Sequence, residues 1–331
     1  MIMEKYKALV IKEVEDKKFQ REIVEKHISE LPEGEVLIEV KYSSLNYKDA
    51  LSASGNKGVT RNYPHTPGID AAGIVRESSD GNFAAGEKVL VTGYDLGMNT
   101  SGGFQQYIRV PAHWVVKLPE NLDLKEAMMY GTAGFTAALS VYKLVSAGIN
   151  PEQGKVLVTG STGGVGSIAV AILSKLGYEV VGVTGKPDKK DMLLKLGAKD
   201  IILREEADDN SGRALLKGKW AGVIDTVGGN ILATAVKSTE YGGVVTCCGN
   251  AASPELPTSV FPFILRGVSL LGVDSVQCPM DLRLKIWKLL SSDWKIDLSS
   301  STEEVSLEGL NEKIDVILQG KLAGRVIVNL S

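Results

Sequence analysis

The sequence predicts an α/β protein with two domains, in which a doubly wound parallel sheet accompanies a strand-rich domain. The chain of 331 residues is about twice the usual domain length. Its second half alternates short apolar strands with helical segments, which is typical of a parallel sheet covered on both faces. The first of these strands leads into a glycine-rich turn, VLVTGSTGGVGSIAV at residues 156–170.

Short strands dominate the first part of the chain, from Tyr6 to about Lys117. Each candidate strand is β-branched or alternates polar with apolar residues, and each ends at Gly, Pro or Asn, which favours β structure. This pattern predicts a barrel-like first domain. The segments are YKALVIKEV (6–14), GEVLIEVKYSSL (34–45), GIDAAGIVRES (68–78), GEKVLVTG (86–93) and FQQYIRVPAHWVVKL (104–118).

The pattern changes near Leu124, where a long apolar helix is expected over residues 128–148. Strands then alternate with helices, including helices at 167–177 and 188–197. The expected strands are KVLVTG (155–160), EVVGVTG (179–185), DIIL (200–203), AGVIDTVG (221–228), GGVVTCCGN (242–250) and VSLLGV (268–273). Helical segments are expected between them where the length allows.

The chain after Asp274 does not continue this alternation. It contains a predicted helix at 280–293, another near 307–318, and a final strand, GRVIVNL, at 324–330. These elements are therefore expected to return to the first domain.

Composition and charge exclude several classes of protein. The chain is 44% hydrophobic and 23% charged with a net charge of −3, which is typical of a soluble globular protein without a nucleic-acid or membrane partner. No apolar run approaches the roughly 18 residues of a membrane span. The N-terminus carries acids and lysines where a signal peptide needs an apolar core. We therefore expect a cytoplasmic protein.

Cysteines and histidines do not form a recognisable site in the sequence. The cysteines include no C-x-x-C pair, so free thiols in a reducing compartment are expected, with a catalytic cysteine as the alternative. The histidines are scattered, so no metal site is expected. These residues are Cys247, Cys248, Cys278, His27, His65 and His113.

The glycine turn between a strand and a helix is typical of dinucleotide-binding folds. In a G-x-G-x-x-G alignment, Ser161 takes the first position and Gly163 and Gly166 take the others. Gly163 would let the backbone approach a pyrophosphate, and Gly166 would let the helix pack closely on the sheet. The helix N-terminus, with the intervening Thr162, Gly164 and Val165, would face the phosphates. A turn needed only for packing is the alternative.

The second strand of the nucleotide-binding region indicates which nucleotide is bound. NAD-binding versions carry an acidic residue about 20 residues after the turn. This chain has Thr184, Gly185 and Lys186 there, and Arg204 follows the third strand. A hydroxyl, a glycine and cations suit a 2′-phosphate, so NADPH is the predicted cofactor. The alternative for Lys186 is a solvated surface lysine.

Several motifs together resemble the medium-chain dehydrogenase/reductase superfamily. The closest likeness is to its zinc-free quinone oxidoreductases of YhdH/YhfP type, which include NADPH-dependent acryloyl-CoA reductases. The motifs are SSLNYKDAL (43–51), YPHTPGIDAAG (63–73), GGFQQYIRVP (102–111), GTAGFTAALS (131–140), TGSTGGVG (159–166) and LAGRVIVNL (322–330). The resemblance implies a GroES-like catalytic domain at residues 1–125 and 275–331 and a Rossmann domain at 126–274.

One departure from the alcohol dehydrogenases of this superfamily concerns zinc. Where those enzymes hold the metal with a cysteine and a G-H-E histidine, this chain has Asn46 and Gly68-Ile69-Asp70. Ile69 cannot bind a metal, and zinc needs three or four N, O or S ligands at close range. We therefore expect no metal.

Hydride transfer to an activated double bond is the chemistry that this resemblance implies. The predicted substrate is a small 2-enoyl-CoA such as acryloyl-CoA, and quinone reduction is the alternative. A third hypothesis is a non-catalytic NADPH-binding sensor or structural protein. The resemblance also implies a homodimer, in which strand 268–273 pairs with its copy.

Motif positions assign further residues to this site. Tyr47 would bond the cofactor or donate to the developing enolate, or it packs in the cleft as a partly wet aromatic, and Asn46 would orient neighbouring groups. Lys48 and Asp49 are expected to form a solvated pair. Lys57 and Arg61 could meet a CoA phosphate, although an exposed basic loop is the simpler interpretation. The remaining cofactor candidates are Gly249, Asn250, Ser275 and Arg325.

Overall fold

In a computed structural model, residues 5–331 are described and form two compact units. The first unit comprises the chain up to Thr132 together with Val276–Ser291 and Leu298–Ser331. The second comprises Ala133–Ser275 and Ser292–Asp297. The first division falls inside helix α2 (Leu124–Ser146), next to Gly131, whose backbone leaves the helical conformation at φ 50° and ψ −155°.

The second unit contains a parallel sheet in the order β10-β9-β8-β11-β12-β13. All six strand segments predicted in this part of the chain are confirmed. The order reverses between β8 and β11, which is where doubly wound sheets bind nucleotides at their carboxyl ends. The strands are β8 (Lys155–Val158), β9 (Glu179–Thr184), β10 (Asp200–Leu203), β11 (Trp220–Asp225), β12 (Thr239–Cys247) and β13 (Ser269–Gly272).

Helices connect these strands as the apolar periodicity predicts. Helix α3 (Gly164–Lys175) buries eight consecutive residues, from Gly166 to Leu173, so it is covered on all sides along this run. The expected helix at 188–197 is shorter, with a 3₁₀ turn, η4 (Pro187–Lys189), before α4 (Lys190–Lys195). The other elements are α5 (Gly229–Lys237), α6 (Phe261–Arg266), η3 (Pro151–Gln153) and η5 (Arg204–Ala207).

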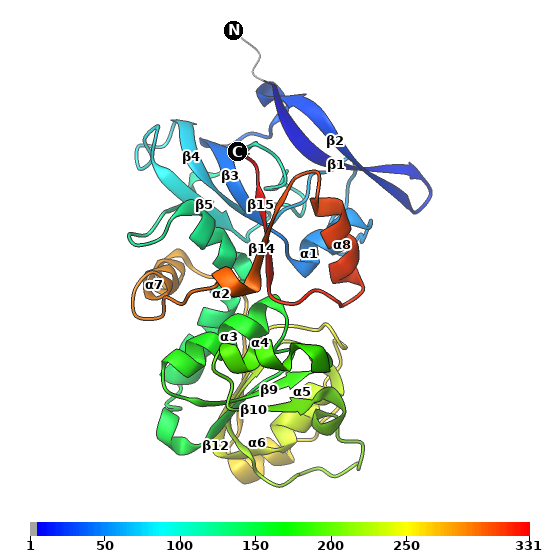
Figure 1. Cartoon of the computed structure of the whole chain (residues 1–331), viewed down its shortest axis with the longest axis vertical. Coiled ribbons are helices and arrows are strands. Elements are labelled where there is room, and N and C mark those ends of the chain that lie inside the picture. The colour runs from blue at the N-terminus through cyan, green and yellow to red at the C-terminus, as the bar shows by residue number, and fades with distance from the viewer. Residues whose placement is uncertain (1–4) are drawn as a thin grey trace. The chain divides into compact units, whose positions relative to one another are not determined.

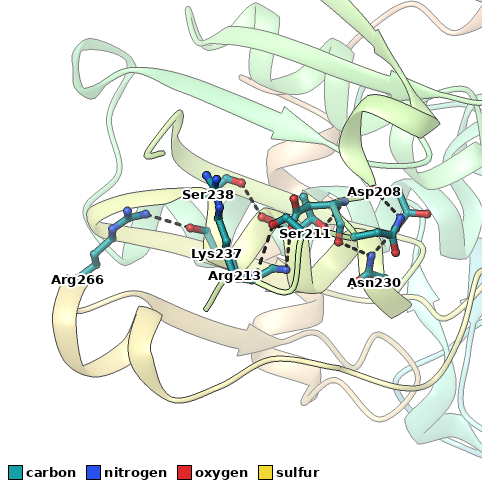
Figure 2. Close-up of polar contacts among 10 residues, drawn as sticks. Asp208, Ser211, Arg213, Asn230, Lys237, Ser238 and Arg266 are labelled. Carbon is teal, nitrogen blue, oxygen red and sulfur yellow. Dashed lines mark hydrogen bonds and ion pairs between the residues drawn. The ribbon is translucent and has the colours of Figure 1, made fainter. Parts of the chain in front are cut away.

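The connection from η5 to β11 has no helix along residues 208–219. Polar bonds to α5 hold it instead, as Figure 2 shows around Asn230 and Lys237. Asn230 Nδ2 donates to Asp208 Oδ1 at 2.6 Å, and Lys237 Nζ lies 3.1 Å from Asp209 Oδ2. Arg266 donates in turn to the Lys237 carbonyl at 3.0 Å. A polar, glycine-containing segment has no apolar stripe with which to form a packed helix, so side-chain bonds order it.

The first unit contains a seven-stranded sheet in the order β14-β15-β3-β4-β5-β7, with β6 paired to β3. Figure 1 labels β3, β4, β5, β14 and β15 of this sheet. The strand-rich prediction is therefore confirmed, although β2 and β14 were not predicted. A separate hairpin, β1–β2, completes the strands. The bounds are β1 (Lys5–Glu15), β2 (Lys18–His27), β3 (Val36–Ser44), β4 (Asp70–Ser78), β5 (Lys88–Thr92), β6 (Tyr107–Val110), β7 (Val116–Lys117), β14 (Thr302–Ser306) and β15 (Arg325–Asn329).

Helix α1 (Tyr47–Ala53) follows β3 directly and packs against α8 (Leu310–Leu318), as Figure 1 shows. The C-terminal strand β15 pairs with β3, so the end of the chain lies beside the segment that leads into α1. The remaining elements are α7 (Met280–Leu290), η1 (Ile28–Glu30), η2 (Ala112–Trp114) and η6 (Ser299–Ser301). Among residues 5–331, none of the helices is long and apolar enough to span a membrane.

Candidate functional site

The glycine turn lies between β8 and α3, with Gly163 as the residue before the helix. The Gly163 N–H donates to the Gly160 carbonyl at 2.9 Å, which closes the turn. A Cβ on Gly166 would lie 2.4 Å from the Gly160 oxygen, so only glycine permits this approach. A Cβ on Gly163 would have just one neighbour within 4 Å, at 3.3 Å, which leaves room beside this backbone.

The two hydroxyl residues of the turn are buried. Ser161 Oγ donates to the Val183 carbonyl at 2.8 Å, so this side chain ties the turn to β9. Thr162 Oγ1 lies 3.3 Å from Thr184 Oγ1. The first-turn N–H groups of α3, which include those of Gly164 and Val165, have no partner within the helix, and such groups bind anions.

Two cations lie together after β9 and β10. A Cβ on Gly185 would meet Arg204 Nη2 at 2.4 Å, which shows that the guanidinium packs on the Gly185 backbone. Burial lowers the pKa of the Lys186 ammonium, and the nearby Arg204 charge lowers it further. No carboxylate in the described chain forms an ion pair with Arg204. An anion held here would relieve the repulsion between the two cations.

Three further candidates follow the carboxyl ends of β12 and β13. A Cβ on Gly249 would lie 2.1 Å from the Thr226 carbonyl oxygen, so the loop after β12 packs on the end of β11. Asn250 next to it is exposed, and Ser275 ends the first segment of the second unit, just beyond β13. These residues and the glycine turn therefore follow the same edge of one parallel sheet.

A buried polar cluster in the first unit centres on Asp70, the first residue of β4. Ser44 Oγ donates to Asp70 Oδ2 at 2.5 Å and Asn46 Nδ2 donates to it at 2.7 Å. The Thr132 backbone N–H lies 3.0 and 2.9 Å from the two carboxylate oxygens, and Thr132 Oγ1 donates to Oδ1 at 2.6 Å. The carboxylate thus caps the part of α2 that begins at Thr132.

Arg325 completes this cluster. Its guanidinium donates to Ser44 Oγ at 2.8 Å, to the Met129 carbonyl at 3.1 Å and to the Leu45 carbonyl at 3.2 Å. A Cβ on Gly131 would lie 2.4 to 3.0 Å from polar atoms of Ser44, Asp70 and Arg325. Arg325 is 4% exposed, and these bonds engage it inside its own unit. Its cofactor role stays a prediction.

Asp49 is fully buried, so the expected solvated pair with Lys48 is wrong. Its oxygens accept the backbone N–H groups of Asn46 and Ile69, each at 2.8 Å. Burial raises the pKa of Asp49 to about 7, and the Asp70 charge adds to the rise. Asn46 is therefore held through both its backbone and its side chain, and it presents Tyr47, 45% exposed, at the start of α1.

This cluster does not fit zinc. Position 69 is isoleucine, and the Asn46 amide and the Asp70 carboxylate already bond each other and their neighbours. Among residues 5–331, no three His, Cys, Asp or Glu side chains are grouped to hold a metal ion. The cysteines are poorly suited to act as nucleophiles, because burial raises the pKa of Cys247, raises that of Cys248 to about 12, and encloses Cys278.

Sequence reasoning missed the roles of Asp70, Ser44, Thr132 and Gly131. A glycine inside an otherwise helical apolar run signals a break or a close approach, so Gly131 could have been singled out. The partners of Asp70 could not have been identified from the sequence, because they come from segments far apart in the chain.

Comparison with known proteins agrees with this architecture. A sequence profile described as "Alcohol dehydrogenase GroES-like domain" matches residues 32–120, and one described as "Zinc-binding dehydrogenase" matches residues 164–292. YhfP of Bacillus subtilis, which carries a provisional quinone oxidoreductase name, is 51% identical over 91% of this chain and 92% of its own. The chain belongs to the medium-chain dehydrogenase/reductase family. Within that family it is of the quinone oxidoreductase and acrylyl-CoA reductase type, and it is an oxidoreductase.

Other family members refine the comparison. Acrylyl-CoA reductase AcuI of Ruegeria pomeroyi is 44% identical over 98% of this chain and 99% of its own. The crystal structure of Escherichia coli K-12 YhdH with bound NADPH superposes with a TM-score of 0.95 at 44% identity, covering 98% and 100% of the two chains. That of Bacillus subtilis YhfP, with a TM-score of 0.96 at 48% identity over 99% and 100%, contains NAD. The relatives thus differ in the dinucleotide that they hold.

Proposed function

We propose that this protein is an NADPH-dependent reductase that adds hydride to the activated C=C bond of a small 2-enoyl-CoA such as acryloyl-CoA, without a metal. The observation that carries the proposal is the pair of cations beside Gly185, at the position where NAD-binding folds place a carboxylate. The 44% identity to AcuI over nearly the whole chain supports the substrate class.

Residues of the second unit would hold the coenzyme. The N–H groups at the start of α3 would bind its pyrophosphate, and the room beside Gly163 allows that approach. Lys186 and Arg204 would bind the 2′-phosphate, with Thr184 beside them. Gly249, Asn250 and Ser275, which follow β12 and β13, would lie along the nicotinamide part.

NADPH, when bound, supplies the hydride, and the protein must stabilise the negative charge that forms on the thioester oxygen. Tyr47 is our candidate for that task, because its side chain is exposed while the backbone before it is fixed. We propose that Tyr47 Oη donates a hydrogen bond to this oxygen and that Asn46 acts as a positioning residue. Asn46 does so through its bonds to Asp70 and Asp49.

The metal-free part of the proposal follows from the same cluster. The side chains around Asp70 form a closed set of hydrogen bonds, and residue 69 offers no ligand atom. We expect the rate of NADPH oxidation to be the same before and after extensive dialysis against a strong chelator. Loss of activity that Zn²⁺ restores would contradict this part.

Quinone reduction is the second candidate, favoured by the name that YhfP carries. NADPH absorbance should be followed with acryloyl-CoA, crotonoyl-CoA and a benzoquinone in parallel. Turnover of the thioesters supports the first function, and turnover of the quinone alone supports the second. Tight NADPH binding without turnover of any of the three would favour a non-catalytic role.

We also propose that the protein is a homodimer in which β13 pairs with its copy. Strand β13 is the last in its sheet, so one side has no partner within the described chain. The neighbouring helix α6 exposes Ile264 at 67% and Leu265 at 56%. An open edge beside apolar side chains favours association. Light scattering should give twice the mass of the chain, and a monomeric mass would exclude the dimer.

A further inference from the structure

Two cations in and after α1 have no carboxylate partner among residues 5–331. Lys48 is the second residue of α1, and Arg61 lies in the loop that follows this helix. Both touch the loop at 93–100. Lys48 Nζ lies 4.0 Å from Met98 Sδ, and the backbone N–H of Arg61 donates to Asn99 Oδ1 at 3.3 Å. The Lys48 side chain and the Arg61 backbone therefore contact consecutive residues of one loop.

The acidic residues nearby are already engaged. Asp49 is buried and bonded to the backbone. The carboxylate of Asp95, in the same loop, accepts Asn99 Nδ2 at 3.0 Å and Thr100 Oγ1 at 2.9 Å. Neither Asp49 nor Asp95 forms an ion pair with Lys48, which is half-buried next to Tyr47 in the sequence, or with the exposed Arg61.

Lys57, a third cation of this region, differs from Lys48 and Arg61 because it has a carboxylate partner. Lys57 pairs with Glu13 at 2.9 Å, and its ammonium lies 4.7 Å from the centre of the Tyr63 ring. The charge of Lys57 is thus satisfied within the protein. Of the basic residues in and after α1, Lys48 and Arg61 are the ones left for a ligand.

We propose that Lys48 and Arg61 bind the phosphate groups of the coenzyme A part of the substrate. This inference rests on the proposed function and deepens it, because it specifies an acyl-CoA rather than a quinone. Coenzyme A carries a diphosphate and a 3′-phosphate, which attract cations strongly, whereas a quinone carries no charge. Binding the distant phosphates would hold the acyl end beside Tyr47, so that remote binding energy positions the reacting bond.

The test compares two thioesters with the same acyl group, acryloyl-CoA and acryloyl-N-acetylcysteamine, which has no phosphate. In Lys48→Gln and Arg61→Gln, we expect the ratio of KM for acryloyl-CoA to KM for the short thioester to rise about fivefold each. In the double variant it should rise about 20-fold. Added salt should weaken the use of acryloyl-CoA more in the wild type than in the double variant.

Lys57→Gln is the matched control, because it removes the same charge from the same region but breaks only an internal ion pair. Its KM ratio should stay that of the wild type. An unchanged ratio in the double variant, or equal changes for both thioesters, would overturn the assignment.

Calorimetric titration with free coenzyme A separates this inference from the proposed function. If the wild type binds coenzyme A and the double variant loses most of the affinity, the phosphate site stands even without turnover. Such a result without turnover would refute the reductase proposal. Turnover of acryloyl-CoA with equal coenzyme A affinity in both proteins would leave the reductase proposal and refute the phosphate site.

Discussion

The glycine turn and the Asp70 cluster are assembled in opposite ways. Residues 160–166 form one continuous stretch, a turn that runs into the start of α3, and the contact of Gly166 with Gly160 lies within it. The Asp70 cluster draws its members from β3, β4, α2 and β15, which lie as much as 281 residues apart in the chain. A local motif can be recognised by its spacing, whereas a cluster built from distant segments emerges only when the chain folds.

Removing the charge of Asp70, at the centre of the cluster, should have the largest effect on the free energy of unfolding. Asp70→Asn keeps the shape but removes the stronger of the two negative charges near the buried Arg325, those of Asp70 and Asp49. It also places an amide NH₂ where donors now converge. We expect a loss of about 3–5 kcal/mol in the free energy of unfolding. Urea denaturation measures it. A loss below about 1 kcal/mol would show that the cluster matters less than a single exposed ion pair.

A smaller loss of stability is expected from a substitution at Gly131, where the backbone of α2 leaves the helical conformation. Gly131→Ala places a methyl group against Ser44 and Asp70 at a φ of +50°, so the variant should lose about 2–3 kcal/mol. Gly148→Ala is the control, because Gly148 also has a positive φ, +94°, but nothing lies within 4 Å of its Cβ position. Equal losses in the two variants would attribute the effect to backbone strain alone.

The proposed role of Lys186 in the second unit is tested by the affinity of the protein for its coenzyme. Lys186→Glu places a carboxylate beside Arg204, where it would repel a 2′-phosphate and accept ribose hydroxyls. NADPH should bind about 100-fold more weakly, equivalent to about 2.7 kcal/mol, while the affinity for NADH changes little. Fluorescence titration with both coenzymes checks this. Equal changes for NADPH and NADH would refute the phosphate role of Lys186, and NAD in the YhfP crystal makes this a sharp test.

The last expected effect is a pH dependence of stability that comes from Asp49. Its pKa is raised to about 7 in the fold, against about 3.9 in an unfolded chain. The folded state therefore binds more protons between these values, and stability falls as pH rises from about 4 to about 7. In Asp49→Asn this slope should shrink. Urea unfolding of both proteins at several pH values measures it, and parallel pH profiles would contradict the assignment.

Particular elements and residues show how much of the fold can be predicted from the sequence. The strands β8 to β13 and the helix α3 follow from apolar runs and turn residues, because a buried parallel strand must be apolar along its length. Strands β2 and β14 were not predicted, because their sequences, KFQREIVEKH and TEEVS, are largely polar and lack the apolar pattern of a buried strand. Asp49 was assigned by sequence to a solvated pair. It is buried with protein partners instead, because neighbouring segments cover it.

The sequence alone determined the class of the fold, the position of the glycine turn and the pair of cations that favours NADPH. These depend on spacing along a short stretch of chain. Tertiary structure decided how Asp70, Arg325, Asn46 and Thr132 bond one another, and that Asp49 is buried rather than solvated. The physical reason is that a side chain's hydrogen bonds and burial depend on whatever the fold brings beside it, wherever in the chain that neighbour stands.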